Sequence, residues 1–132
     1  MTGPLPTELA KIPYLEVIYF HDNELTGTIS EAYASMRHLK SLVLKGNMLT
    51  GTIPDIYWDA NFLQYLNIGD NSLNGTVSTE VGKLTNLESL YFFSNLFEGT
   101  LPSEIGNLGF LGKWNELGQS LPHLLTSSCI IM

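Results

Sequence analysis

The first candidates for acid–base chemistry in this sequence are His21 and Asp22. They are adjacent in the chain, so on a strand their side chains point to opposite faces, and no serine or cysteine nucleophile has an evident place beside them. Another carboxylate, Asp70, follows Asp22 after two intervals of 24 residues. If each interval adds one strand to a sheet, the two carboxylates lie roughly 10 Å apart, near the upper limit for an inverting glycosidase. Acidic residues also recur at turns because water solvates them there, so we expect no catalytic residue and no enzyme activity.

Metal ions and nucleotide cofactors require residue patterns that this chain lacks. Its three histidines and its single cysteine, Cys129, are scattered and do not have the spacing of a metal-ligand set. The glycine-rich segment GNLGFLG at 106–112 has neither the dinucleotide-binding nor the P-loop spacing. We therefore expect no metal site and no cofactor.

The composition restricts the classes of partner. The formal net charge is −7, and only six lysines and arginines are present among 132 residues. Nucleic-acid binding depends on clustered positive charge, so we expect no nucleic-acid partner. We also expect no transmembrane segment, because there is no run of about 18 apolar residues, and no signal peptide in the N-terminal MTGPLPTELAKIP. A single cysteine cannot close an internal disulfide, which leaves the compartment open.

Two short motifs point to different compartments. Asn74-Gly75-Thr76 is an N-glycosylation sequon, which is used in the secretory lumen. The final residues Cys-Ile-Ile-Met match the prenylation pattern with Cys129 as acceptor, which is cytosolic chemistry. Only Lys113 is basic among the preceding twenty residues, so the second signal for stable membrane anchoring is missing. At most one of the two motifs is used.

A repeated segment dominates the sequence. The stretch LTGTIS at 25–30 returns as LTGTIP at 49–54, LNGTVS at 73–78 and FEGTLP at 97–102. Leucine-type residues and asparagines recur at the same interval of 24, giving the consensus LxxLxLxxNxLxGT[ILV][PS]. The asparagine column consists of Asn23, Asn47, Asn71 and Asn95.

These residues resemble the leucine-rich repeat of the plant type, as found in the ectodomains of receptor-like kinases and receptor-like proteins. The resemblance covers roughly residues 3 to 111. It implies an α/β fold, namely a right-handed solenoid with a concave parallel β-sheet and short 3-10 or α turns on the convex side. A fold of this kind does not by itself specify a ligand.

The physical chemistry of each column leads to the same fold. Alternating apolar and polar residues fit a half-buried strand, and stacked strands pair into a parallel sheet. The asparagine follows each strand, where its amide can bond to the backbone of its own turn and of the adjacent coil. We expect these asparagines to form a structural ladder. The glycine that follows permits positive φ or close approach of the next coil.

The repeats divide the chain into a half repeat, four full repeats and a degenerate tail. The expected boundaries are 1–14, 15–38, 39–62, 63–86, 87–110 and 111–132. A half repeat leaves the first full strand with an open edge, so we expect a fragment, an incomplete sequence or a chain that self-associates through its solenoid ends. The tail is expected either to fold over the last coil or to be disordered.

The concave face offers the best candidates for binding. On each strand the outward positions are free to vary, and we expect Tyr65, Tyr91 and Phe93 to cluster there on neighbouring strands. Exposed aromatic residues with polar neighbours are typical of protein interfaces. The predicted partner-binding residues are Tyr19, His21, Lys45, Tyr65, Asn67, Tyr91 and Phe93.

We therefore expect a module that binds a protein or peptide ligand, forms part of a receptor-like protein, and lies outside the cell or at its surface as the resemblance implies. The alternative is an intracellular scaffold that is weakly tethered to a membrane through a prenylated Cys129. The two hypotheses differ in the modification that they predict, a glycan on Asn74 or a prenyl group on Cys129.

Overall fold

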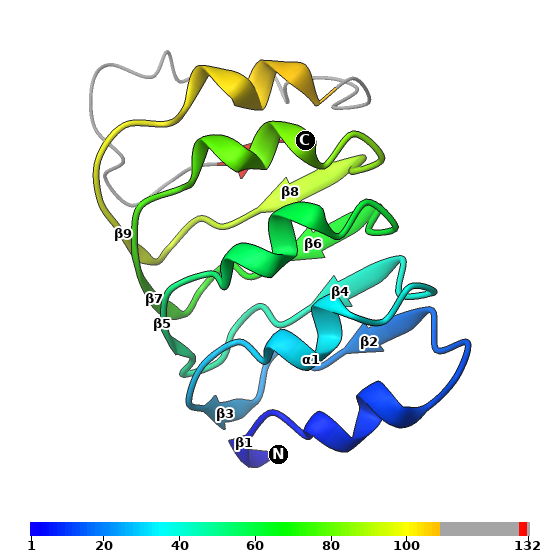
Figure 1. The fold of residues 1–132 in the computed structure, drawn as a ribbon. Coiled ribbons are helices and arrows are strands. Elements are labelled where there is room, and N and C mark those ends of the chain that lie inside the picture. Colours follow the sequence, from blue (N-terminus) through cyan, green and yellow to red (C-terminus); the bar gives the residue numbers. More distant parts are fainter. Residues whose placement is uncertain (109–129, 132) are drawn as a thin grey trace.

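The computed structural model describes residues 1–108 and 130–131, which form a stack of similar coils (Figure 1). Each coil contributes one strand to a parallel sheet, and corresponding strands begin 24 residues apart. These strands are β2 (Val17–Tyr19), β4 (Ser41–Val43), β6 (Tyr65–Asn67) and β8 (Ser89–Tyr91). They pair in register, so that Ile18, Leu42, Leu66 and Leu90 form one row across the sheet. The α/β leucine-rich-repeat solenoid that the sequence predicts is confirmed.

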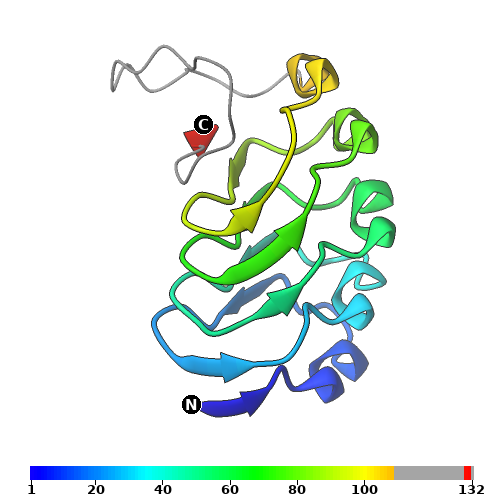
Figure 2. The same ribbon diagram turned by 90° about the vertical axis from the view of Figure 1, so that its left-hand side faces the viewer.

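A second set of short strands lies on the side where the chain leaves the main sheet. The strands are β1 (Thr2–Pro4), β3 (Glu24–Thr26), β5 (Thr50–Gly51), β7 (Ser72–Gly75) and β9 (Leu96–Phe97). β1 pairs with β3, and β5, β7 and β9 form a three-stranded parallel sheet. Figure 2 shows these strands stacked toward the viewer. The repeated glycines adopt φ angles of 80 to 84° here, which turn the chain toward the convex side.

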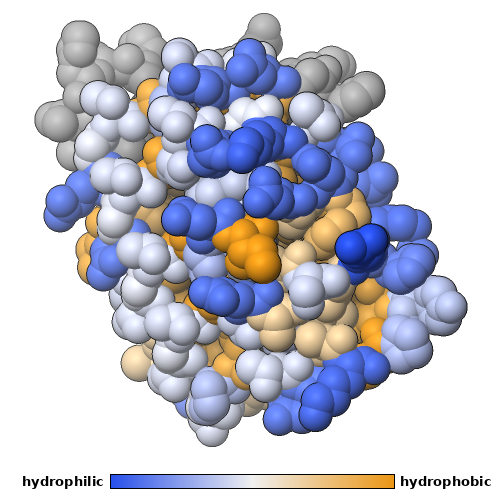
Figure 3. All heavy atoms as spheres, viewed as in Figure 1, coloured by the Kyte–Doolittle hydropathy of each residue, from blue (hydrophilic) through white to orange (hydrophobic). Residues whose placement is uncertain are grey.

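The convex side consists of single helical turns, one per coil. They are η1 (Thr7–Lys11), α1 (Glu31–Ala34), η2 (Asp55–Asp59), η3 (Thr79–Lys83) and η4 (Ser103–Asn107). Ser30 and Ser78 each cap such a turn by accepting a hydrogen bond from a backbone N–H two residues later. Mostly polar side chains cover this side, with apolar side chains in the gaps between them (Figure 3).

The core is one continuous apolar stripe between the main sheet and the convex turns. Leu42, Leu66 and Leu90 are at most 1% exposed, and each contacts the equivalent layer of the next coil. Burying a leucine side chain contributes about 1.5 to 3 kcal/mol relative to leaving it in water. Every coil therefore depends on its neighbours for a large part of its stability.

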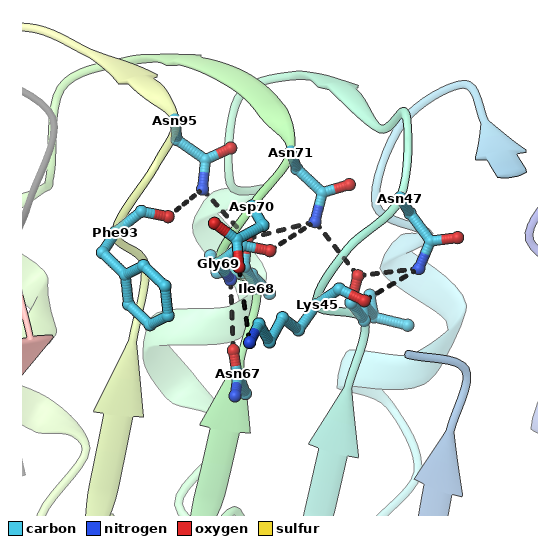
Figure 4. A network of polar contacts seen from close by, with 10 residues as sticks. Lys45, Asn47, Asn67, Ile68, Gly69, Asp70, Asn71, Phe93 and Asn95 are labelled. Carbon is cyan, nitrogen blue, oxygen red and sulfur yellow. Dashed lines mark hydrogen bonds and ion pairs between the residues drawn. The ribbon is translucent and has the colours of Figure 1, made fainter. Parts of the chain in front are cut away.

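The asparagines after each strand bond in the same way from coil to coil (Figure 4). The Asn71 side-chain amide donates to the carbonyl oxygens of Ile68 and Gly69 in its own turn and of Leu44 in the preceding coil, at 3.2, 3.0 and 3.0 Å. Its Oδ1 accepts a hydrogen bond from the Leu49 N–H at 3.0 Å. Asn47 and Asn95 repeat this pattern, while Oδ1 of Asn23 accepts from the N-terminal amino group at 2.7 Å.

Two buried tyrosines connect coils on the convex side. The Tyr33 hydroxyl donates to the carbonyl oxygen of Pro6 at 2.9 Å, and the Tyr57 hydroxyl donates to that of Ser30 at 2.7 Å. Burial, with a smaller contribution from Glu8, raises the pKa of Tyr33 to about 12, and burial also raises the pKa of Tyr57. Both hydroxyls are therefore held in their neutral, donating form.

The two edges of the main sheet differ. β2 lies at one edge, and of the eight large hydrophobic residues that are exposed in the described part of the chain, five fall within residues 1–19. At the other edge β10 (Ile130–Ile131) pairs with β8 in the antiparallel direction, with Ile130 opposite Tyr91. Residues 109–129 and Met132 lie outside the described residues, and with them Cys129 and most of the predicted tail, so the fold of the tail stays a prediction.

Candidate functional site

The concave face is set by the alternation of side chains along β2, β4, β6 and β8. Because the central residue of each strand points into the core, its two neighbours point out of the concave face. These outward positions carry Tyr19 on β2, Tyr65 on β6 and Tyr91 on β8. Tyr19 is 59% exposed, whereas Tyr65 and Tyr91 are half-buried by their neighbours.

Three aromatic rings come together at one part of this face. The ring centroids of Tyr65 and Tyr91 are 5.4 Å apart with a tilted geometry, and those of Tyr91 and Phe93 are 6.4 Å apart with an edge-to-face geometry. We call Tyr65, Tyr91 and Phe93 the aromatic cluster. Each contact lies in the range in which aromatic pairs attract beyond simple burial.

The absence of a side chain at Gly69 allows Lys45 to contact Phe93, although the two residues lie two coils apart. A β-carbon at Gly69 would lie 3.2 Å from the Phe93 ring, so the missing side chain leaves room for this ring above the intervening coil. The Lys45 ammonium lies 5.8 Å from the Phe93 ring centroid, within cation–π range. It also lies 3.5 Å from a carboxylate oxygen of Asp70 (Figure 4).

The electrostatics favour a neutral ring surface beside one charged pair. Partial burial raises the pKa of Tyr91, and the neighbouring Tyr65 adds to this effect. Tyr91 therefore keeps its hydroxyl proton at neutral pH. The side chains of Lys45 and Asp70 are 41% and 38% exposed, so water screens their attraction and both can reach a ligand.

The remaining predicted residues lie elsewhere. Tyr19 and His21 contact each other with ring centroids 6.3 Å apart, at the β2 end of the sheet, away from the aromatic cluster. Asn67 differs from the expectation of an exposed polar contact, because it is only 8% exposed. Its Oδ1 accepts a hydrogen bond from the Gly69 N–H at 3.2 Å, so this side chain supports the turn.

Sequence reasoning treated Asp70 only as a weak catalytic candidate and did not predict its ion pair with Lys45 beside the aromatic cluster. Asp70 belongs to a column of left-handed residues together with Asp22, Gly46 and Ser94, whose φ angles lie between 51° and 69°. Asp, Gly and Ser are typical turn residues. Their recurrence every 24 residues at this position could have predicted a turn directly after each strand of the main sheet. The Asp70 side chain pairs with Lys45, whereas the carboxylate of Asp22 lies against Gly46, so close that a β-carbon at Gly46 would clash with it.

The described residues hold no other chemical centre. Within residues 1–108 and 130–131, no group of three or more His, Cys, Asp or Glu side chains could bind a metal ion. Over the same residues, no helix combines the length and the apolar character needed to cross a bilayer. Among the described residues, the concave face carries the aromatic cluster and the Lys45–Asp70 ion pair.

Comparison with protein families identifies the repeat. The model described as "Leucine Rich Repeat" matches residues 38–59, 62–84 and 86–108, which together exceed half of the chain. A comparison with curated protein sequences gave no match.

Several solved plant structures share the fold. The plant peptide hormone receptor RGFR1 in complex with RGF2 superimposes with a TM-score of 0.79 and 30% identity over 83% of this chain. The Arabidopsis receptor kinase HAESA in complex with the peptide hormone IDA and the co-receptor SERK1 gives 0.75 and 32% over 81%. A plant ice-binding protein gives 0.77 and 30% over 81%. This chain spans 18%, 18% and 35% of the length of these three chains, so the same coils occur in proteins with different roles.

Proposed function

The chain belongs to the leucine-rich-repeat family, and we propose that it is a non-catalytic module that binds a peptide or protein through its concave sheet. The observation that carries this proposal is the aromatic cluster next to the Lys45–Asp70 pair. Half-buried rings around a partly exposed charge are the composition of an interface hot spot. A ligand that covers them would exclude water from both the rings and the ion pair.

The direction of the sheet supports an extended ligand that runs across the strands. Tyr65 and Tyr91 lie on β6 and β8, and Lys45 follows β4, so the candidate contacts span three adjacent coils. A peptide that follows the stacking direction meets one outward row of side chains per coil. Peptide-hormone complexes among the structural neighbours support the same class of ligand, and by this likeness we propose a receptor-like role.

A selected peptide provides the test. A random peptide library is displayed and selected on the wild-type chain, and the affinity of the best peptide is measured by fluorescence anisotropy. Tyr91→Ala and Phe93→Ala should each lower its affinity about fivefold or more, which corresponds to about 1 kcal/mol for an aromatic anchor. Ile56→Ala is the control, because Ile56 is exposed on the convex turn η2 and its loss should leave affinity unchanged.

Equal binding of the selected peptides to wild type, Tyr91→Ala and Phe93→Ala would refute the concave site. The thermal melts of the variants should be recorded in parallel, because a folded variant with lost affinity separates a binding role from a structural one.

The compartment follows from the two modification motifs, and we propose that Asn74 is the one used. Asn74 is exposed on β7, on the side of the coil opposite to strand entry, so a glycan there would leave the concave face open. A prenylating enzyme would have to bind the C-terminal residues. Because Ile130 and Ile131 pair with β8, this binding would compete with the strand pairing. Intact-mass spectrometry of the native protein distinguishes an added glycan from an added prenyl group.

We also propose, as a second candidate, that the chain self-associates through the outer edge of β2. The outer edge of β2 has no strand beside it among the described residues, and Val17 and Tyr19 are 46% and 59% exposed there. Open strand edges of this kind pair with other chains. Sedimentation velocity over a hundredfold range of concentration measures this directly, and a constant monomer would exclude it.

A further inference from the structure

A groove of about 690 Å³ lies on the flank where the chain passes from the second set of strands to the convex turns. The connecting segments can be followed in Figure 2, where each runs from a short strand to a helical turn. Equivalent segments of the first three coils line the groove. The lining residues that enter the argument are Leu5, Thr28, Ile29, Glu31, Thr52 and Pro54. We call it the flank groove; neither Asn74 nor the aromatic cluster lines it.

The connecting segments have backbone groups that no other part of the described chain uses. Ser30 and Pro54 have extended backbone conformations, with ψ angles of 126° and 135°. Among residues 1–108 and 130–131, the backbone N–H and C=O groups of Thr28 and Thr52 make no hydrogen bond to other backbone groups. Both threonines are exposed, and their hydroxyls can donate and accept. A ligand in the flank groove therefore meets the same set of hydrogen-bonding groups in successive coils.

Apolar side chains form the floor of the flank groove. Leu5 and Ile29 line it but are only 5% and 3% exposed, because they belong to the core. The polar groups thus lie along the walls above an apolar base. This arrangement suits a chain with an extended backbone better than a single ion.

The charge of the flank groove is entirely negative. Glu31 lines it, and no lysine or arginine is among the described residues that do so. Glu8 and Asp55 directly follow the lining residues Thr7 and Pro54, and all three carboxylates belong to exposed residues. Within the described part of the chain, none of the three has an ion pair. The net charge of −7 adds a field that attracts cations from a distance.

The effect of these carboxylates is felt at the backbone beside the flank groove. The Tyr33 hydroxyl donates to the carbonyl oxygen of Pro6, and burial together with the charge of Glu8 raises the pKa of Tyr33. The Tyr57 hydroxyl donates to the carbonyl oxygen of Ser30, and burial, Tyr33 and the charge of Glu31 raise the pKa of Tyr57. Glu8 and Glu31 therefore act on the same flank, where no cation offsets them among the described lining residues.

We propose that the flank groove binds a basic, extended segment of a partner protein, which runs across the coils with a lysine or arginine side chain at Glu31 and hydrogen bonds to the connecting segments. The sign of the charge disfavours nucleic acid and anionic lipid, which carry phosphates. This surface lies on a different side from the concave face, so the proposal does not depend on the ligand proposed there.

The test uses two fluorescein-labelled peptides of opposite charge, with sequences KTKTK and ETETE. Fluorescence anisotropy of the full chain should show saturable binding of KTKTK and none of ETETE. The measurement is made at physiological ionic strength, because a Debye length of about 8 Å then screens distant charges. Glu31→Lys should weaken KTKTK binding about tenfold or more. Glu98→Lys is the matched control, because Glu98 is exposed two coils beyond Thr52 and should alter affinity less than about twofold.

Thr28→Val tests the hydroxyl wall without a change of charge. The variant keeps the shape of the side chain and should weaken KTKTK binding about two- to threefold, while circular dichroism confirms folding. Thr100→Val is its control, because Thr100 is exposed at the equivalent position of the fourth coil and does not line the flank groove.

Absence of saturable KTKTK binding would overturn the proposal. Equal losses in Glu31→Lys and Glu98→Lys would also overturn it, because they would indicate a general charge effect. Competition by spermine as strong as that by unlabelled KTKTK would mean that any polycation binds, which contradicts recognition of an extended chain. Tyr91→Ala should leave KTKTK affinity unchanged, so failure of the flank groove and failure of the concave site give different results.

Discussion

The interior columns and the concave face of this solenoid use the 24-residue repeat in opposite ways. In the interior, Leu42, Leu66 and Leu90 occupy equivalent positions, and Asn47 and Asn71 make equivalent hydrogen bonds. On the concave face, equivalent positions carry Tyr19, Val43, Asn67 and Tyr91. Stability is thus distributed over all coils, whereas the surface that we propose for recognition consists of unlike residues that meet around Gly69.

This difference gives each kind of residue a distinct expected phenotype. Removal of an interior residue breaks contacts both within its own coil and to the neighbouring coil, so it should lower the free energy of unfolding. Truncation of a concave residue removes a ring or a charge that is already partly in contact with water. It should therefore change the affinity for a ligand more than the free energy of unfolding. Substitutions that violate this division would show that the concave face also holds the coils together.

Asn71→Ala should have the largest effect on stability among the changes considered. The substitution removes four hydrogen bonds and leaves carbonyl oxygens of Leu44 and Ile68 and the Leu49 N–H without that partner. We expect the free energy of unfolding to fall by about 2 to 4 kcal/mol. Urea denaturation followed by circular dichroism measures this loss.

Asn74→Ala is the matched control for that change. Asn74 is exposed in the same coil, and its side chain makes no hydrogen bond to another described residue, so the variant should stay within about 0.5 kcal/mol of wild type. Similar losses in both variants would mean that the ladder does not carry the stability assigned to it.

Gly75→Ala should have the next largest effect. Gly75 has a φ angle of 84°, and a β-carbon there would lie 2.9 Å from the methyl group of Thr52. Backbone strain and overlap together should cost about 1 to 3 kcal/mol. Gly106→Ala is the control, because a β-carbon at Gly106 would meet no atom of residues 1–108 or 130–131 within 4 Å. If the two alanine variants melt at the same temperature, the close approach of coils at Gly75 is not important.

The interior could be predicted from the sequence because its physical cause is local and repeated. One leucine or asparagine in a column is ambiguous, but the same residue at the same interval in four coils indicates one buried row. The 3-10 turns were predicted for the same reason. The strands β3, β5, β7 and β9 were not, because two to four residues that end in a glycine turn give no period-2 pattern.

The surfaces were only partly predictable. Neighbouring strands bring Tyr65 next to Tyr91, and strand spacing alone suggests this contact. The contact of Lys45 with the Phe93 ring depends on the missing side chain of Gly69, which no period of the sequence indicates. The pairing of β10 with β8 joins segments about 40 residues apart without any repeat, so no periodicity could indicate it.

Tyr33→Phe should have a smaller effect, and its size should depend on pH. At pH 7 the variant loses the hydrogen bond to Pro6, which should cost about 1 kcal/mol. In the wild type the folded-state pKa of Tyr33 is raised from 10.0 to about 12, so its contribution to stability is complete below pH 10 and is lost as the pH rises toward 12.

The deficit of the Tyr33→Phe variant should therefore shrink between pH 10 and 12, because the variant has no hydroxyl to ionise at this position. Urea denaturation at pH 7, 10.5 and 11.5 measures the trend, with Tyr14→Phe as the control at a side chain that is 75% exposed. A deficit that stays constant across this range would contradict the assigned burial of the hydroxyl.

Lys45→Met should have the smallest effect on stability and so tests the division between interior and surface most strictly. The variant keeps an apolar chain beside Phe93 but removes the ion pair with Asp70, which is partly exposed and should contribute less than about 0.5 kcal/mol. Lys40→Met removes the more exposed pair with Glu16, whose side chains are 49% and 53% exposed, and is the matched control. Both variants should unfold like the wild type, but only Lys45→Met should weaken a peptide selected on the concave face. If Lys45→Met lost more than about 1 kcal/mol of stability, the charge that we assign to recognition would instead be holding adjacent coils together.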